Sequence, residues 1–362
     1  MTPAYGGALP DPSFWAGRKV LLTGHTGFKG SWLARWLQLL GADVTGVSLP
    51  EPPTRPSLWE QLDLSGVADL RADIRSGVWT EAARAFAPSI VLHLAAQPLV
   101  SVGYEEPALT YEINVLGTVR VLEFAATLDS ADAILVITTD KVYDPAQTPP
   151  HDEMHALGGR EPYSASKAAA EIVVAGWPQM RAACATARAG NVIGGGDWAQ
   201  NRLLPDLVRA WSAAATPQLR RPGGVRPWQH VLEPLRGYLV FAEALAEGRD
   251  LPPSLNFGPA DRQSVSAAEL TAYASGAWRE LGGELPEPAW IESVSGSFAE
   301  TGELTLDSTL AAETLGWSSV LDWHTAVALT LEWYASASAG QAAAMLVDRQ
   351  LAAYTDIVAS AS

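Results

Sequence analysis

The chain has 362 residues, 48% of them hydrophobic and 18% charged, and this composition predicts a globular protein and excludes a disordered one. Its formal net charge of −16 disfavours nucleic acid and anionic membranes as partners, and no apolar run is long enough to span a bilayer. The single cysteine, Cys184, excludes an intrachain disulfide framework and a multi-cysteine metal site, so we expect a cytoplasmic protein without a metal ion.

Short apolar strands alternate with helical segments through the first half of the chain. Buried strands are expected at 19–23, 43–49, 89–96, 133–139 and 185–192. Helices are expected at 32–40, where apolar residues recur at helical spacing, at about 108–128, and directly after Tyr163. This alternation is typical of an α/β fold with a doubly wound parallel sheet of the Rossmann type.

The strand–helix pattern loosens after about residue 190. We expect a main domain over 17–190 with about 232–256, and a smaller C-terminal α/β substrate domain over about 191–231 and 257–345. The Ala- and Ser-rich stretch after residue 335 is expected to form a final helix with a frayed end.

Three glycines, Gly24, Gly27 and Gly30, lie between the first strand and the first helix. Such glycines allow a tight turn and let a pyrophosphate approach the backbone, while the helix N-terminus offers unpaired N–H groups. The spacing is G-x-x-G-x-x-G and not the commoner G-x-G-x-x-G, and an ordinary Gly-rich turn is the alternative. The position directly after the first strand favours dinucleotide binding.

The end of the second strand bears on which nicotinamide cofactor binds. An acidic residue there would hold the ribose of NAD, but the chain offers Ser48. Arg55 could meet a 2′-phosphate, although it fits a surface loop better, so NAD is preferred and NADP stays open. Asp73 and Ile74 lie in RADIR (71–75), after a further strand that precedes this segment, and they suit contact with the adenine. The alternative is that Asp73 caps the next helix.

Tyr163 and Lys167 are spaced i, i+4, which places them on one face of a helix. A phenol with a pKa near about 10 is too weak a base at neutral pH. A neighbouring ammonium and a cationic nicotinamide would lower this pKa. The pair therefore predicts nicotinamide-dependent oxidation of a hydroxyl, with Tyr163 as the base.

Thr139, Asp140 and Lys141 follow a predicted strand, and the carboxyl ends of parallel strands face the cofactor crevice. Thr139 can donate a hydrogen bond to the substrate hydroxyl beside Tyr163. Asp140 and Lys141 exceed what hydride transfer needs, which indicates a second proton-transfer step. A turn in which Asp140 caps the next element is the alternative.

Several stretches resemble the extended short-chain dehydrogenase/reductase family: TGHTGFKGSWL, HLAAQPLV, TTDKVYD, YSASK, RAGNVIGGGDW, and RPWQHVLEP with NFGP. The resemblance covers roughly residues 17–335. GGGDW and RPWQHV fit the branch that acts on CDP-sugars, and Asp140-Lys141 stands where related nucleotide-sugar dehydratases carry Asp-Glu. The resemblance implies an NAD-binding main domain, a nucleotide-sugar-binding second domain and a CDP-sugar substrate.

The resemblance also implies a 4,6-dehydratase reaction. Tyr163 and NAD oxidise C4 of the glucose ring, water leaves across C5 and C6 with Asp140 as the acid toward the C6 hydroxyl, and the hydride returns to C6. Lys141 either takes the C5 proton as a neutral amine or stays charged and stabilises the enolate.

The matching stretches imply a set of binding residues. Cofactor contacts are expected at Gly24, Thr26, Gly27, Phe28, Lys29, Gly30, Asp73, Ile74, Ala95, Ala96, Tyr163 and Lys167. Substrate contacts are expected at Asn114, Arg188, Asn191, Arg202, Arg226 and His230. Arg226 is the preferred diphosphate ligand, because a guanidinium binds phosphate bidentately, although a domain-bridging salt bridge is the alternative for any of these arginines. Asn114 could instead order the loop backbone.

Pro178 is expected to end the catalytic helix early or to kink it. That helix forms dimer contacts in relatives, so we expect a homodimer.

Two classes of rival function remain at this point. One is a nucleotide-sugar 4-epimerase, or a dehydratase for another nucleotide sugar; the epimerase would not need Asp140 and Lys141. The other is a non-catalytic NAD(P)-binding sensor, a class that often lacks the Tyr or the Lys.

Overall fold

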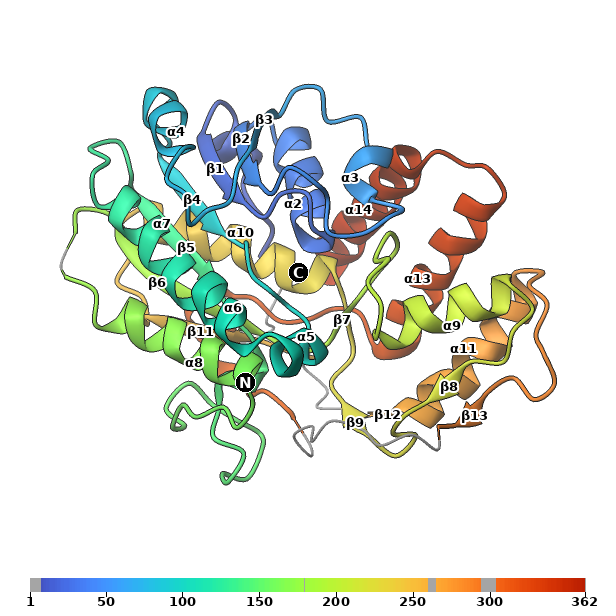
Figure 1. Cartoon of the computed structure of the whole chain (residues 1–362). Helices are drawn as coiled ribbons and strands as arrows, with labels where there is room; N and C mark the ends of the chain where they lie inside the picture. Colours follow the sequence, from blue (N-terminus) through green and yellow to red (C-terminus); the bar gives the residue numbers. More distant parts are fainter. Residues whose placement is uncertain (1–7, 179, 260–264, 294–303, 362) are drawn as a thin grey trace.

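A seven-stranded parallel sheet in the order β11-β6-β5-β4-β1-β2-β3 forms the centre of the molecule (Figure 1). The structure is a computed structural model that describes residues 8–178, 180–259, 265–293 and 304–361. The strands are β1 (Lys19–Thr23), β2 (Asp43–Ser48), β3 (Ala68–Arg71), β4 (Ile90–His93), β5 (Ala133–Ile137), β6 (Ala183–Ala189) and β11 (Ser254–Phe257). The strand order reverses between β1 and β4, where doubly wound sheets bind ligands, and the expected Rossmann-type fold is confirmed.

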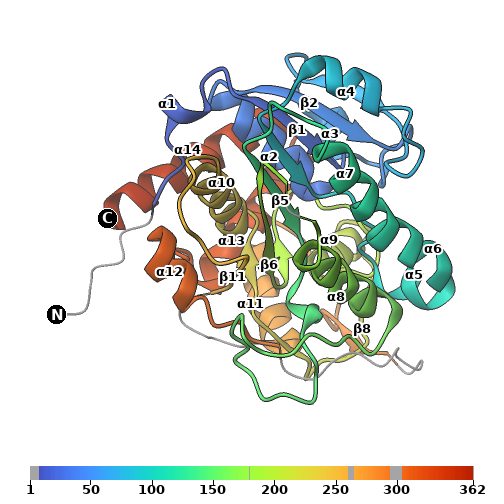
Figure 2. The same cartoon turned by 90° about the vertical axis from the view of Figure 1, so that its left-hand side faces the viewer.

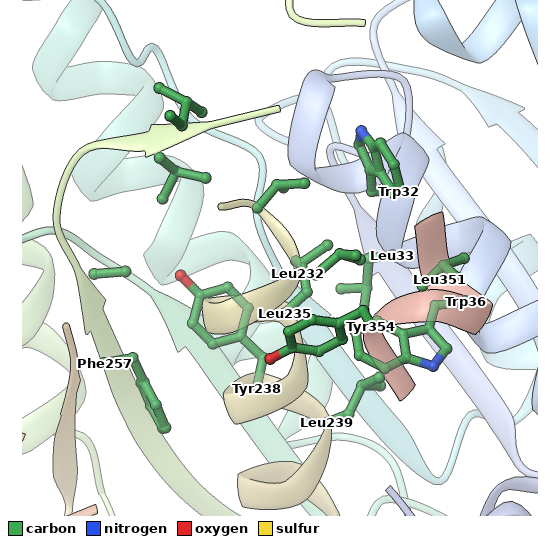
Figure 3. Close-up of a cluster of buried hydrophobic side chains, with 14 of the residues drawn as sticks. Trp32, Leu33, Trp36, Leu232, Leu235, Tyr238, Leu239, Phe257, Leu351 and Tyr354 are labelled. Atoms are coloured by element: carbon green, nitrogen blue, oxygen red, sulfur yellow. The ribbon is translucent and has the colours of Figure 1, made fainter. Parts of the chain in front are cut away.

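Helices cover both faces of this sheet because its strands are apolar on both sides. In β1, Val20 and Leu22 pack into one buried cluster and Leu21 into another. Figure 2 shows α7 (Gly117–Ala125) and α8 (Pro162–Ala175) on one side, and α10 (Leu232–Ala246) and α14 (Ala343–Ala361) on the other. Figure 3 shows the second side in detail, where side chains of α10 and α14 meet those of α2 (Phe28–Leu39).

The helical stretch expected at 108–128 consists of consecutive segments. They are α6 (Pro107–Tyr111), a π-helical turn (Glu112–Leu116) and α7, and they follow α5 (Val100–Glu105). Helix α8 begins where the Glu161 carboxylate accepts hydrogen bonds from the backbone N–H groups of Tyr163 and Ser164. The helix has ended by Gly176, so Pro178 lies beyond it and does not kink it.

Shorter elements complete the chain. They are α1 (Pro12–Trp15), α3 (Leu58–Gln61), α4 (Thr80–Phe86), a 3₁₀ turn (Asp140–Val142), β7 (Val192–Ile193), α9 (Leu203–Ser212), β8 (Gln218–Leu219), β9 (Val225–Arg226), β10 (Gln229–His230), β12 (Val265–Ser266), α11 (Ala267–Glu280), β13 (Ile291–Glu292), α12 (Thr309–Leu315) and α13 (Trp323–Ser338). Helices α9 and α11 group with β8 and β13 at one end of the molecule (Figure 1). Parts of the expected second domain, 260–264 and 294–303, lie outside the described residues.

The C-terminal stretch differs from the expected frayed end. Helix α14 buries one apolar side, which includes Leu346, Leu351 and Val358. The Tyr354 hydroxyl accepts a hydrogen bond from Arg236 Nε at 2.8 Å and donates one to Glu233 Oε2 at 2.8 Å, which ties α14 to α10. The expected final helix is therefore confirmed, and the expectation of a frayed end is wrong for the described residues, which are helical to Ala361. None of the described helices is long and apolar enough to cross a membrane.

Candidate active site

A cleft of about 1320 Å³ begins at the carboxyl ends of the central strands and extends to α9 and the short strands β8 and β9. Small-molecule sites commonly measure roughly 300–1,000 Å³. The cleft is therefore large enough for a dinucleotide and a second ligand together.

The Gly-rich loop between β1 and α2 forms one end of the cleft. Gly24 has a φ of +77°, and a Cβ there would lie 2.7 Å from the backbone nitrogen of Ala95. A Cβ on Gly30 would lie 2.1 Å from the carbonyl oxygen of Gly24. At Gly27, the N-cap of α2, no side chain caps the helix. The loop therefore presents bare backbone and a helix N-terminus to the cleft, as a pyrophosphate requires.

Ser48 holds this loop in place. Its Oγ accepts a hydrogen bond from the backbone N–H of Thr26 at 3.2 Å and lies 3.0 Å from His25 Nδ1. His25 Nε2 in turn lies 2.9 Å from Asp69 Oδ1. Sequence reasoning missed His25, because an isolated histidine inside a glycine motif gives no sign of its partners. Arg55, the candidate for a 2′-phosphate, pairs with Glu51.

The expected adenine contacts, Asp73 and Ile74, both line the cleft. Ala95 and Ala96, which were expected to contact the cofactor, line it as well. Hydrogen bonds from Arg75 hold the pKa of the Asp73 carboxyl below its usual range. Asp73 does not cap the next helix, because the N-cap of α4 is Trp79 and has no side-chain cap.

Phe28 and Lys29 also line the cleft. The Lys29 ammonium is buried and donates a hydrogen bond to the Tyr238 hydroxyl at 3.3 Å. Burial lowers the pKa of Lys29 to about 7, and the nearby cations Arg202 and Lys167 act in the same direction.

The five expected catalytic residues line the same cleft: Thr139, Asp140, Lys141, Tyr163 and Lys167. Thr139 N-caps the 3₁₀ turn, and its Oγ1 donates to Asp140 Oδ1 at 2.9 Å. Lys167 Nζ donates to the carbonyl oxygen of Ile137, the last residue of β5, at 2.9 Å. These contacts place the 3₁₀ turn beside the catalytic face of α8.

Burial raises the pKa of Tyr163 to about 12, although the hydrogen bond with Thr139 and the charge of Arg202 oppose the shift. Within the protein Tyr163 is therefore a neutral phenol, in contrast to the expected lowering by its neighbour. The positive charge of an oxidised nicotinamide would favour the phenolate further.

Asp140 is buried, and its Oδ2 has no hydrogen-bond partner among the described residues. Burial raises the pKa of the Asp140 carboxyl above its usual range, although Lys141 and the hydrogen bond from Thr139 oppose the shift. The group is therefore disposed to carry a proton that it can donate into the cleft.

The expected substrate residues separate into two groups. Asn191, Arg202 and Arg226 line the cleft, and Arg202 Nε lies 3.5 Å from Asp197 Oδ2. Arg226 is buried at the edge where β9 meets the cleft.

The other three do not line the cleft, which corrects their expected role. The Arg188 guanidinium is buried against the Glu171 carboxylate. Asn114 accepts a hydrogen bond from the Gln97 backbone at 2.8 Å and donates to its carbonyl oxygen at 3.1 Å, so it orders that loop. His230 is fully buried beside Trp32, and burial lowers its pKa to about 3.

The sequence matches the model of the NAD dependent epimerase/dehydratase family over residues 20–257. The chain belongs to this family. It is 39% identical over 340 residues to the CDP-glucose 4,6-dehydratase of Salmonella typhimurium, covering 87% of this chain and 93% of that protein. It is 24% identical over 333 residues to the dTDP-glucose 4,6-dehydratase of Xanthomonas campestris pv. campestris, covering 87% and 92%.

A solved structure shares the fold. DesIV, a dTDP-glucose 4,6-dehydratase from Streptomyces venezuelae solved with NAD and TYD bound, superposes with a TM-score of 0.76 at 23% identity. The match covers 89% of this chain and 98% of that one. The resemblance to nucleotide-sugar-modifying short-chain dehydrogenases is confirmed.

Proposed function

We propose that this protein is a CDP-glucose 4,6-dehydratase, an NAD-dependent hydro-lyase that forms CDP-4-keto-6-deoxyglucose for deoxysugar biosynthesis. The observation that carries the proposal is that Asp140 and Lys141 line the same cleft as Thr139, Tyr163 and Lys167. An epimerase needs only the last three. The relative at 39% identity supports the same reaction and the same nucleotide.

NAD fits the first half of the cleft. The glycine loop leaves no room for side chains at Gly24 and Gly30, and Asp73 and Ile74 lie where an adenine could be held. When bound, NAD would accept a hydride from C4 and return it to C6, so the reaction has no net redox change.

Tyr163 and Thr139 act on the C4 hydroxyl. Tyr163 takes its proton as C4 is oxidised, and Thr139 hydrogen-bonds to the same oxygen. The Lys167 ammonium, fixed on the Ile137 carbonyl, supplies positive charge near the tyrosine.

Asp140 and Lys141 act on the elimination. The C4 ketone makes the C5 proton acidic, and the C6 hydroxyl leaves as water once Asp140 gives it a proton. Lys141 is half-buried at the cleft wall. It either accepts the C5 proton as a neutral amine or stabilises the enolate as an ammonium. Loss of one proton from C5 and of hydroxide from C6 accounts for the water.

Arg202 and Arg226 would hold the diphosphate, with Asn191 beside them on the cleft wall. A chain with a net charge of −16 needs such a local cluster of cations to retain an anionic sugar nucleotide. Planar guanidinium groups suit this role because each can bind a phosphate bidentately.

Arg226→Ala is expected to raise KM for CDP-glucose by about ten- to one-hundred-fold, because hydrogen bonds to charged groups contribute about 1.5–3 kcal/mol. The effect on kcat should be smaller, since a diphosphate contact remote from C4–C6 stabilises substrate and transition state alike. Steady-state kinetics measures both constants. Arg120→Ala, which removes an exposed arginine of α7, is the control. An unchanged KM in Arg226→Ala would show that Arg226 does not bind the substrate.

We propose the two-domain division given by the sequence: an NAD-binding domain of 17–190 with about 232–256, and a nucleotide-sugar-binding domain of about 191–231 and 257–345. Pairing of β11 with β6 and packing of α10 on β5 support the inclusion of 232–256. The single cysteine supports a cytoplasmic location.

We also propose a homodimer formed through the outer face of α6, the π-helical turn and α8. Three large apolar side chains are exposed there, with exposed fractions of 40% for Tyr111, 54% for Leu116 and 62% for Ile172. These segments contact one another, so the side chains belong to neighbouring elements. Exposed apolar side chains on adjoining helices are typical of a subunit interface.

Ile172→Asp is expected to convert the dimer to a monomer, because it places a charge in an apolar interface. Sedimentation velocity measures the change. Met345→Asp, at an equally exposed position of α14, is the matched control and should leave the dimer intact. Retention of the dimer in Ile172→Asp would place the interface elsewhere.

The proposed function is tested by incubating the purified protein with CDP-, dTDP-, GDP- and UDP-glucose and following the absorbance of a 4-keto sugar in alkali. We expect product from CDP-glucose at the highest kcat/KM. Preference for another nucleotide would correct the base, and no 4-keto-6-deoxy sugar from any of the four would overturn the proposal.

A further inference from the structure

A buried ion pair lies directly behind the catalytic face of α8. Glu171 follows Lys167 by four residues and Tyr163 by eight, so the three share one side of the helix. The Arg188 guanidinium on β6 donates from Nε to Glu171 Oε1 at 3.0 Å and from Nη2 to Oε2 at 2.9 Å. Both side chains are almost fully buried, and neither lines the cleft.

The Glu171 carboxylate also binds the strand that leads into the catalytic turn. Its Oε1 accepts a hydrogen bond from Thr138, the residue before Thr139, and its Oε2 accepts one from Thr186 of β6 at 2.7 Å. One carboxylate therefore fixes the carboxyl end of β5 against the helix that carries the catalytic tyrosine and lysine.

Arg188 holds the far end of the same turn. Its Nη1 donates to the hydroxyl of Tyr143 at 2.9 Å, and that hydroxyl donates to Asn256 Oδ1 at 2.7 Å. Tyr143 directly follows the 3₁₀ turn Asp140–Val142. The Glu171–Arg188 pair therefore binds the residue two positions before the 3₁₀ turn, Thr138, and the residue directly after it, Tyr143.

We propose that Glu171 and Arg188 are positioning residues for the dehydration: they hold the Thr139–Lys141 turn against the catalytic face of α8, and the Glu171 carboxylate acts on Lys167 one helical turn away. The kinetic part of this inference rests on the proposed function. A bidentate buried pair is suited to the task because it fixes distance and orientation together.

The charges around Lys167 support the second part. Burial lowers the pKa of Lys167 to about 8, and Glu171 is the group that opposes the shift. Lys29 of α2 and His93 of β4 lie near enough for the Lys167 charge to lower the pKa of each. His93, whose pKa falls to about 3, stays neutral, whereas Lys29 disfavours the Lys167 ammonium when it is itself protonated. Asp140 and Lys141 belong to the adjoining turn that packs against α8.

The first variant is Glu171→Gln, which keeps the shape and one acceptor oxygen but removes the charge. It leaves Arg188 buried without its counter-charge, which is strongly destabilising. The double variant Glu171→Gln with Arg188→Met removes both charges together, so it is expected to fold. Glu123→Gln, at an exposed carboxylate of α7, is the control for charge removal alone.

The first measurement is the titration of Lys167 by NMR in protein labelled at the lysine ε-carbons. The chain has only four lysines, Lys19, Lys29, Lys141 and Lys167, so each signal can be assigned with single Lys→Arg variants. Glu171→Gln is expected to lower the proton affinity of Lys167 about tenfold, one pKa unit. The double variant should lower it by a smaller factor, because it also removes the positive charge of Arg188. Glu123→Gln should leave it unchanged.

The second measurement is steady-state kinetics with CDP-glucose. The double variant should lose about 10²-fold in kcat, as small displacements of catalytic groups do, while KM stays near the wild-type value. An unchanged Lys167 titration or an unchanged kcat in a folded double variant would overturn the proposal. Failure of the double variant to fold would also overturn it, by assigning the pair to stability. If the wild-type protein is inactive on CDP-glucose, the proposed function is wrong. The Lys167 titration can still be measured in that case, because it needs no turnover.

Discussion

Tyr163→Phe is expected to lower kcat for CDP-glucose by about 10²–10⁴-fold, the usual contribution of a general base. The substitution removes only the phenolic oxygen, so the buried ring still fills its place on α8. Cofactor binding should persist, because the glycine loop is untouched. Rapid mixing with CDP-glucose should show no reduction of bound NAD, since the variant fails at the first step.

Tyr273→Phe, which removes a phenol on α11 outside the cleft, is the control for loss of a hydroxyl. Cofactor content, measured after gel filtration, separates loss of chemistry from loss of NAD. A Tyr163→Phe protein that turns over within about tenfold of wild type would mean that another group removes the C4 proton.

Asp140→Asn is expected to slow product formation by about 10²–10⁴-fold while leaving oxidation at C4 intact. Asn preserves the shape and the acceptor for Thr139, but it cannot give a proton to the C6 hydroxyl. Because the wild-type pKa of Asp140 is raised by burial, elimination should weaken as the pH rises through that pKa. The variant should lack this dependence on Asp140.

Single-turnover mixing of Asp140→Asn with CDP-glucose, followed by the absorbance of reduced nicotinamide, checks this expectation. Reduced cofactor should accumulate on the enzyme and decay slowly. Asp144→Asn, at a carboxylate outside the cleft, is the control. Neither build-up nor slower product formation would rule out Asp140 as the acid. No reduction at all would mean that Asp140 organises the first step.

The sequence predicted most of the central sheet, because most of its strands are short apolar runs between helical segments. Strand β11 was not among the expected strands, because it joins the sheet from the far half of the chain. The glycine loop was also predictable from local sequence, because its three glycines lie in a single turn. Tyr163 and Lys167 were predictable because both lie on one helix, four residues apart. The sequence also predicted a final helix, but not that helix α14 would stay ordered to its end. Its order depends on packing against α10 and on the Tyr354 hydrogen bonds.

Arg188 was wrongly predicted to bind the substrate because the prediction relied on its residue type. An arginine after a parallel strand suits a phosphate, but the side chain is taken up by Glu171. That partner becomes visible only when β6 and α8 are packed together. One signal was present in the sequence: Glu171 lies on the same side of α8 as Tyr163 and Lys167, where a buried carboxylate needs a counter-charge.

The fate of deuterium in CDP-[4-²H]glucose is the most direct test of the proposed dehydration. We expect a product that is lighter than the substrate by one water, is oxidised at C4 and carries the deuterium at C6, as mass spectrometry and NMR of the purified sugar nucleotide would show. A product of unchanged mass with deuterium still at C4 would contradict it, because that outcome belongs to an epimerase and leaves Asp140 and Lys141 without a reaction.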